Sequence, residues 1–120
     1  MGLFSRFIGK AGEDKAVLYL KKKHYRILER NYRTRYGEID IIAQIGNVTV
    51  FVEVKQRKDE QFGRPEDWVT PQKKNRIISA AKRYLFEKEN YNDYFRFDVI
   101  AITANEIIHM ENAFEADSKI

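Results

Sequence analysis

The 120-residue sequence contains no cysteine, which excludes a disulfide framework and a thiolate metal site. A chain of this kind suits a reducing compartment, so we expect a cytoplasmic protein. Its longest apolar runs fall short of the ~20 residues that a membrane-spanning helix needs. The segment Met1 to Arg6 is too short for a secretory apolar region, and Arg6 breaks the myristoylation pattern. His24 and His109 lack metal-ligand spacing, and we expect them to be surface or satisfied strand residues.

The length, composition and net charge of the chain limit the class of protein further. Residues 1–120 are the length of one domain, and we expect its core at about 10–112. Hydrophobic residues make up 43% and charged residues 33%, which favours a soluble globular fold. The formal net charge of +4 suits a polyanionic partner, but many small basic proteins bind none. Charge alone therefore does not decide whether the partner is a nucleic acid.

Hydrophobic periodicity predicts two helices and five strands. Ala16, Val17 and Leu20 recur at helical spacing, and Thr70-Pro71 is a favourable helix start. Gly46-Asn47 separates two apolar strands, as a hairpin turn does. The order α-β-β-β-α-β-β predicts an α/β fold with a mixed central sheet flanked by helices. In chain order we expect a helix over 10–23, strands over 25–32, 37–45 and 48–55, a loop over 56–69, a helix from Thr70-Pro71 to about 86, and strands over 95–103 and 106–110.

The turn at Gly46-Asn47 predicts which side chains of the hairpin share a face. A two-residue turn makes Ile45 face Val48, and the remaining pairs follow by counting outward. On the apolar face, which must be buried, the pairs are Ala43 with Val50, Ile41 with Val52, and Ile39 with Val54. On the other face they are Gln44 with Thr49, Ile42 with Phe51, Asp40 with Glu53, and Glu38 with Lys55.

Asp40 and Glu53 are the candidate site, because this register places their Cβ atoms ~5 Å apart. Like charges so close need one carboxylate to protonate or a cation to bridge them, and hard oxygen ligands favour Mg²⁺ or Mn²⁺. Lys55 shares the face and suits a role in stabilising a phosphate or orienting water. The alternative is a solvated polar face with a surface Glu38–Lys55 ion pair. Strands as apolar as these favour burial instead, and buried carboxylates need a partner.

Further polar residues surround this hairpin in the sequence. Glu13 lies on the inward stripe of the first helix, either as a third site carboxylate or as an ordinary first-turn glutamate. Asp98 interrupts an apolar strand, and we expect it either to support neighbouring site residues or to be structural, without a catalytic role. The loop over 56–69 is a substrate-binding flap, a mobile segment or a segment that Trp68 anchors to the core. Phosphate contacts are one use of the nearby cations, although a solvated surface is more frequent. The candidate nucleic-acid-binding residues are Arg57, Lys58, Arg64, Lys73, Lys74, Arg76 and Arg83.

An ordered set of motifs resembles one nuclease superfamily. Gly37-Glu38-Ile39-Asp40, followed by Phe51-Val52-Glu53-Val54-Lys55, is similar to the core of the PD-(D/E)XK nucleases, which include restriction endonucleases and archaeal Holliday-junction resolvases. Ile39 stands where the name of the motif has proline. Nearly the whole chain resembles the uncharacterised YraN-like bacterial proteins of that superfamily. The further matches are Gly12-Glu13, Arg30-Asn31, Phe62-Gly63, Arg96-Phe97-Asp98-Val99 and Asn112-Ala113-Phe114.

The resemblance implies a restriction-endonuclease-like domain and a metal-dependent endonuclease that hydrolyses phosphodiester bonds, with structured DNA as the expected substrate. Asp40, Glu53 and Glu13 would hold Mg²⁺ or Mn²⁺, with Lys55 as the motif lysine and Gln72 as a further catalytic residue on the following helix. Because two-fold junctions suit two-fold proteins, the resemblance also implies a homodimer. Two alternatives stay open: a nucleic-acid-binding module without turnover, and a protein-interaction domain that uses the apolar segment around Phe114.

Overall fold

A computed structural model describes residues 3–57, 67–89 and 94–116, with only the helical backbone for residues 3–9. This part of the chain forms two helices and five strands in the predicted order α-β-β-β-α-β-β, which confirms the mixed α/β fold. In chain order they are α1 (Leu3–Lys22), β1 (Arg26–Arg33), β2 (Glu38–Ile45), β3 (Val48–Gln56), α2 (Pro71–Lys88), β4 (Tyr94–Ile102) and β5 (Ile107–Phe114).

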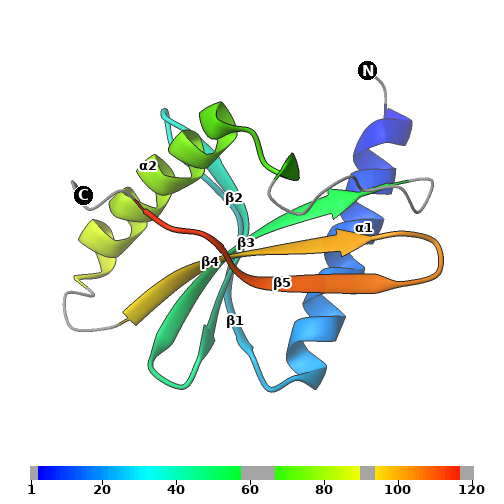
Figure 1. Ribbon diagram of the computed structural model, residues 1–120, viewed down its shortest axis with the longest axis horizontal. Helices are drawn as coiled ribbons and strands as arrows, with labels where there is room; N and C mark the ends of the chain where they lie inside the picture. The colour runs from blue at the N-terminus through cyan, green and yellow to red at the C-terminus, as the bar shows by residue number, and fades with distance from the viewer. Residues whose placement is uncertain (1–2, 58–66, 90–93, 117–120) are drawn as a thin grey trace.

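The strands form one sheet in the order β1-β2-β3-β4-β5 (Figure 1). Neighbouring strands are antiparallel except β3 and β4, which are parallel because α2 carries the chain from one end of the sheet to the other. The strand β3 therefore lies at the centre of the sheet. Its residues from Thr49 to Glu53 are all buried, as is typical of a strand covered on both faces.

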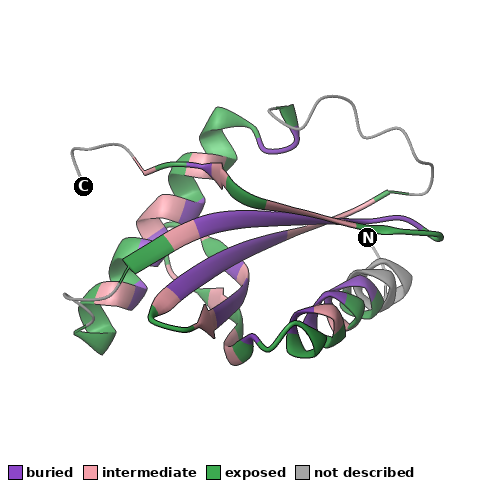
Figure 2. Cartoon of the chain, turned by 60° about the horizontal axis from the view of Figure 1, so that its bottom comes forward, coloured by how far each residue is buried: buried purple, intermediate pink, exposed green. Residues whose placement is uncertain are grey.

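The two helices cover opposite faces of the sheet, and each forms its own apolar core. Against α1 the core includes Leu20, Ile41 and Val52, and against α2 it includes Phe51 and Tyr84. Figure 2 shows the buried residues gathered along the middle of the sheet and on the sheet-facing side of the helices. Within the described ranges, neither helix combines the length and apolarity needed to cross a membrane.

Two elements differ by more than two residues at one end from the sequence prediction. The first helix begins at Leu3 rather than at residue 10, and the last strand continues to Phe114 rather than ending at 110. Asn112 has a φ of 54°, and the pairing of β4 with β5 shifts opposite Asp98. This β-bulge lets β5 continue past Asn112, because an asparagine tolerates the left-handed backbone.

The β2–β3 hairpin has the predicted register, from Ile45 opposite Val48 to Ile41 opposite Val52. The prediction for Ile39 is wrong, because Ile39 packs in the α2-side core whereas Ile41 packs in the α1-side core. The reversal occurs where β2 pairs with β1. Asn31 has a left-handed φ of 52° there, between the pair Arg30 and Ile41 and the pair Tyr32 and Ile39. The regular alternation of faces along β2 therefore fails between Ile41 and Ile39.

Gly37 explains how closely the start of β2 approaches α2. A Cβ atom on Gly37 would lie 2.4 Å from the backbone oxygen of Arg76, well inside contact distance. The glycine thus lets the β1–β2 turn rest directly on the backbone of α2. This contact brings the beginning of β2, with Asp40, towards the first turns of the helix.

Candidate active site

Asp40 lies where the ladder between β2 and β3 ends. The Cα pairing of the two strands stops at Ile41 and Val52, one residue short of the predicted pair of Asp40 with Glu53. Beyond that point Asp40 Oδ2 accepts a hydrogen bond of 2.8 Å from the backbone N–H of Val54. A side-chain carboxylate therefore replaces a backbone carbonyl as the partner of β3 and is fixed beside Glu53.

Glu53 is the buried carboxylate of the pair, with 4% of the residue exposed. Its Oε2 atom lies 2.9 Å from Lys73 Nζ and 3.5 Å from Lys55 Nζ. Lys55 is two residues farther along β3, on the same face, as the alternation of a strand requires. Lys73 comes from the first turn of α2, where its backbone N–H donates to Oγ1 of the N-cap residue Thr70.

The electrostatics of the pair follow from burial. Burial, together with the charge of Glu53 and a hydrogen bond shared with it, raises the pKa of Asp40 to about 7. Partial burial opposes the charged form of Lys73, but its hydrogen bond to Glu53 and the nearby carboxylates raise its pKa above the ordinary value. The site thus holds a buried carboxylate and a second carboxyl that ionises close to neutral pH.

Glu13 is buried on the inward side of α1, but it has other partners. Its Oε1 atom accepts hydrogen bonds from Arg30 Nε at 2.8 Å and from Asn31 Nδ2 at 3.1 Å. Among the residues described, no three His, Cys, Asp or Glu side chains are grouped to hold a metal. The structure therefore brings Asp40 and Glu53 together and leaves Glu13 with Arg30 and Asn31.

The remaining candidates lie in several places. Gln72 is exposed on the first turn of α2 next to Lys73, and Arg76 lines the same groove as Lys73. The other cations are farther apart: Lys74 Nζ lies 5.7 Å from the centre of the Phe114 ring, and Arg83 pairs with Glu87 at 3.0 Å. Arg57 follows β3 directly. Lys58, Arg64 and Phe62-Gly63 lie outside the described residues.

A further buried acid, Asp98 on β4, is fully satisfied by its neighbours. It accepts hydrogen bonds from Arg96 Nε at 3.0 Å and the Asn112 N–H at 3.0 Å, and its Oδ2 lies 2.7 Å from His109 Nε2. Burial opposes ionisation, but these donors outweigh it and lower the pKa of Asp98. His109 also contacts the Tyr19 hydroxyl, so it is a satisfied strand residue as expected. The network ties α1 to β4 and β5.

Sequence reasoning missed two partnerships in the site. It gave Lys73 only a role towards nucleic acid, whereas Lys73 also pairs with Glu53. It did not pair Glu13 with Arg30 and Asn31. An asparagine within an otherwise extended strand was the available signal for a left-handed residue, although nothing in the sequence showed which carboxylate would receive its amide.

The fold and the site define the class of protein. It is a small α/β protein with two adjacent carboxylates and two lysines at one end of a mixed sheet. The profile of "Uncharacterised protein family UPF0102" matches residues 12–102, and the chain belongs to this family. The family membership expected from the sequence motifs is thereby confirmed.

Relatives in several bacteria cover nearly the same length. A UPF0102 protein of Sulfurihydrogenibium sp. is 49% identical over 109 residues, which is 91% of this chain and 95% of that protein. A UPF0102 protein of Persephonella marina is 46% identical over 115 residues, covering 96% of this chain and 99% of its own. One from Clostridium perfringens is 48% identical over 102 residues, covering 85% and 84%.

Proposed function

We propose that the protein is a metal-dependent endonuclease that hydrolyses phosphodiester bonds in nucleic acid, with structured DNA as the expected substrate. The observation that carries the proposal is the placement of Asp40 beside the buried Glu53, with Lys55 next along the same strand. Two adjacent carboxylates and a lysine can hold a cation and face a phosphate at once. The motif order resembles that of the PD-(D/E)XK nucleases, which supplies the reaction.

The donor set fits Mg²⁺ or Mn²⁺ better than a metal that needs a full protein cage. Mg²⁺ is typically held by one or two carboxylates, and waters and substrate phosphates complete its shell. Asp40 and Glu53 provide two carboxylates, and the described residues offer no third side chain in the same group. The Lys73 ammonium 2.9 Å from Glu53 supports a position for positive charge beside this carboxylate. When bound, the metal ion supplies Lewis-acid polarisation of the phosphate and lowers the pKa of water.

The residues of the chain then have distinct roles in the proposal. Asp40 and Glu53 hold the cation, and Asp40 is kept in place by the Val54 N–H. Lys55 stabilises the negative charge that develops on the phosphate, because its ammonium is partly shielded from water beside Glu53. Glu13 joins this set only if Arg30 and Asn31 release it, and Gln72 stands at its edge on α2.

The test is a cleavage assay on purified protein with Mg²⁺, Mn²⁺ or EDTA, using branched, duplex and single-stranded DNA and RNA. We expect metal-dependent cleavage, and a loss of at least about 100-fold in Glu53→Gln and in Lys55→Ala. The matched control is Glu87→Gln, which removes an exposed carboxylate on α2 and should cleave like the parent. Cleavage at the parental rate in both site variants would overturn the assignment.

Metal binding has its own readout, independent of turnover. Isothermal titration calorimetry with Mn²⁺ should give a binding signal that Asp40→Asn and Glu53→Gln remove and Glu87→Gln retains. Binding of DNA without cleavage of any substrate would favour the non-catalytic module instead. The interaction-domain alternative has less support, because Phe114 is 9% exposed and stacks on Phe97 with ring centres 4.9 Å apart. The homodimer stays a prediction that sedimentation velocity checks.

A further inference from the structure

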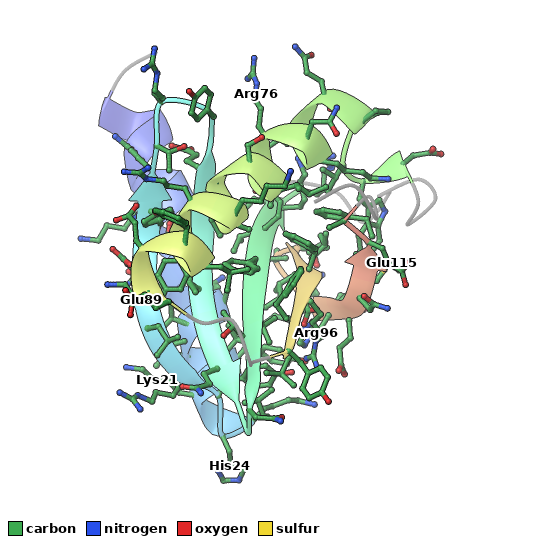
Figure 3. All side chains as sticks on the ribbon, turned by 90° about the vertical axis from the view of Figure 1, so that its left-hand side faces the viewer. Lys21, His24, Arg76, Glu89, Arg96 and Glu115 are labelled. Carbon is green, nitrogen blue, oxygen red and sulfur yellow. The ribbon has the colours of Figure 1, made fainter. Side chains whose placement is uncertain are left out.

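A basic groove lies beside the candidate site, between the β1–β2 turn and α2. Its volume is about 630 Å³, and it is lined by the side chains of Arg33, Arg35, Lys73 and Arg76 with one carboxylate, Glu38. Arg76 projects from α2 at the end of the molecule where the β1–β2 turn closes (Figure 3). Clustered cations around a concave surface are the electrostatic footprint of a phosphate backbone.

The groove is continuous with the carboxylate pair through Lys73. This residue lines the groove, and its ammonium also contacts Glu53 Oε2 at 2.9 Å. A strand held in the groove therefore contacts the lysine that pairs with Glu53. The ion pair between Arg33 and Glu38, at 3.2 Å, is exposed on both sides and so does little to withdraw Arg33 from a ligand.

An aromatic side chain is presented at the edge of the groove. Tyr36 is 62% exposed, and the Arg35 guanidinium lies 5.4 Å from the centre of its ring. The turn that carries it is tightly bonded: the Thr34 N–H donates to the Gly37 carbonyl at 2.8 Å, and Thr34 Oγ1 accepts from the N–H groups of Tyr36 and Gly37 at 3.1 Å. The contact of Gly37 with the α2 backbone fixes the turn from below. An exposed ring on a fixed turn is a suitable surface for stacking.

We propose that this groove binds a nucleic-acid strand that contains unpaired bases, with its phosphates on Arg35, Lys73 and Arg76 and one base stacked on Tyr36. The inference rests on the proposed nuclease function for the identity of the ligand as nucleic acid, and it adds the class of substrate. Duplex bases present only their edges, whereas an unpaired base offers the π-face that an exposed aromatic ring requires. The site is thus suited to single strands, ends or the open arms of branched structures rather than to a continuous duplex.

The experiment measures binding without catalysis. Fluorescence anisotropy in EDTA gives the dissociation constants of a labelled single-stranded oligonucleotide and a blunt duplex of equal length, each as DNA and as RNA. We expect tighter binding of the single strand, and about tenfold weaker single-strand binding for Tyr36→Ala. Tyr36→Phe should keep the parental affinity, since it retains the ring. Arg76→Ala should weaken binding and reduce the salt slope by about one.

Two matched controls separate the groove from the rest of the surface. Tyr94→Ala removes a ring that is 68% exposed on β4, and Lys82→Ala removes one charge farther along α2; both should bind like the parent. Equal losses in Tyr36→Ala and Tyr94→Ala, or a parental preference for duplex, would overturn the inference. The outcomes also separate the two proposals. If binding depends on Tyr36 but no substrate is cleaved, only the proposed nuclease activity is contradicted. If substrates are cleaved but Tyr36→Ala binds like the parent, only the proposed role of the groove is contradicted.

Discussion

Lys73 Nζ lies 2.9 Å from Glu53 Oε2, which joins the first turn of α2 to the buried carboxylate of the central strand β3. Lys73 also lines the basic groove, so one ammonium contacts both the proposed metal position and the proposed path of the substrate. A cation bound to Glu53 and the Lys73 ammonium would therefore compete for the same carboxylate oxygen.

Replacing Lys73 should separate its stabilisation of the folded protein from its competition with a metal ion for Glu53. Lys73→Met leaves Glu53 with Lys55 alone, and we expect a loss of about 1 kcal/mol in unfolding free energy, modest because the lysine is half exposed. Because the competing ammonium is gone, Mn²⁺ should raise the melting temperature of the variant more than that of the parent. Thermal unfolding with and without Mn²⁺ measures both, with Lys82→Met as the control. Equal metal-induced shifts in all three proteins would show that Lys73 does not compete.

The raised pKa of Asp40 predicts a specific pH dependence for the metal-free protein. With a pKa of about 7, the folded state keeps a proton that the unfolded state loses near pH 4. Stability therefore falls as pH rises through this window and levels off above pH 7. Asp40→Asn keeps an acceptor for the Val54 N–H without the charge. The free energy of unfolding of the variant, relative to that of the parent, should therefore be higher at pH 8 than at pH 5. Urea unfolding in EDTA at both pH values measures this difference between the variant and the parent. The same difference at pH 5 and at pH 8 would contradict the raised pKa of Asp40.

Asp98 should behave in the opposite way, because its donors lower its pKa. Asp98→Asn keeps the shape but removes a fully buried charge that Arg96 and His109 contact, and we expect a loss of about 3 kcal/mol at pH 7. The contribution of Asp98 is present above about pH 4, the ordinary aspartate range, and is lost as pH falls below it. Urea unfolding measures the loss, and Glu106→Gln is an exposed control. A loss under 1 kcal/mol would mean that the network is not needed for stability.

Gly37 and Gly46 offer a matched pair for testing the contact between the β1–β2 turn and α2. Gly37→Ala places a Cβ 2.4 Å from the Arg76 carbonyl oxygen, and we expect a loss of about 2 kcal/mol as the turn shifts from the helix. Gly46→Ala meets open space and costs about 1 kcal/mol through its φ of +58°. The Gly37 variant should also bind single strands more weakly, since its groove is distorted. Urea unfolding measures the losses in stability, and fluorescence anisotropy measures the binding. A larger loss in Gly46→Ala than in Gly37→Ala would contradict the contact between the turn and α2.

Much of the fold was predictable because local signals agreed with each other. The turn at Gly46-Asn47 set the register of the hairpin, and Thr70-Pro71 set the start of α2, so both followed from short-range geometry. The closeness of Asp40 and Glu53 followed from that register. Their chemistry as a metal site is a further step that the register supports but does not test.

Two of the errors lie beside a residue with left-handed backbone inside a strand. Asn31 lies on β1 opposite the point where Ile39 changes face on β2, and its amide donates to Glu13; Asn112 lies in the bulge past which β5 continues. Counting along a strand assumes strict alternation, and a single αL residue breaks it. The point at which the alternation breaks depends on tertiary contacts, such as the approach of Gly37 to α2.

The hydrogen bond from the Val54 N–H to Asp40 gives the protein a natural spectroscopic probe. This amide belongs to the central strand, yet its acceptor is an ionisable side chain rather than a backbone carbonyl. Its proton chemical shift and its rate of exchange with deuterium should follow the charge on Asp40, while the neighbouring amides that bond within the ladder stay constant. One backbone resonance would thus report protonation, and any ligand of the carboxylate, without a label and without a substrate.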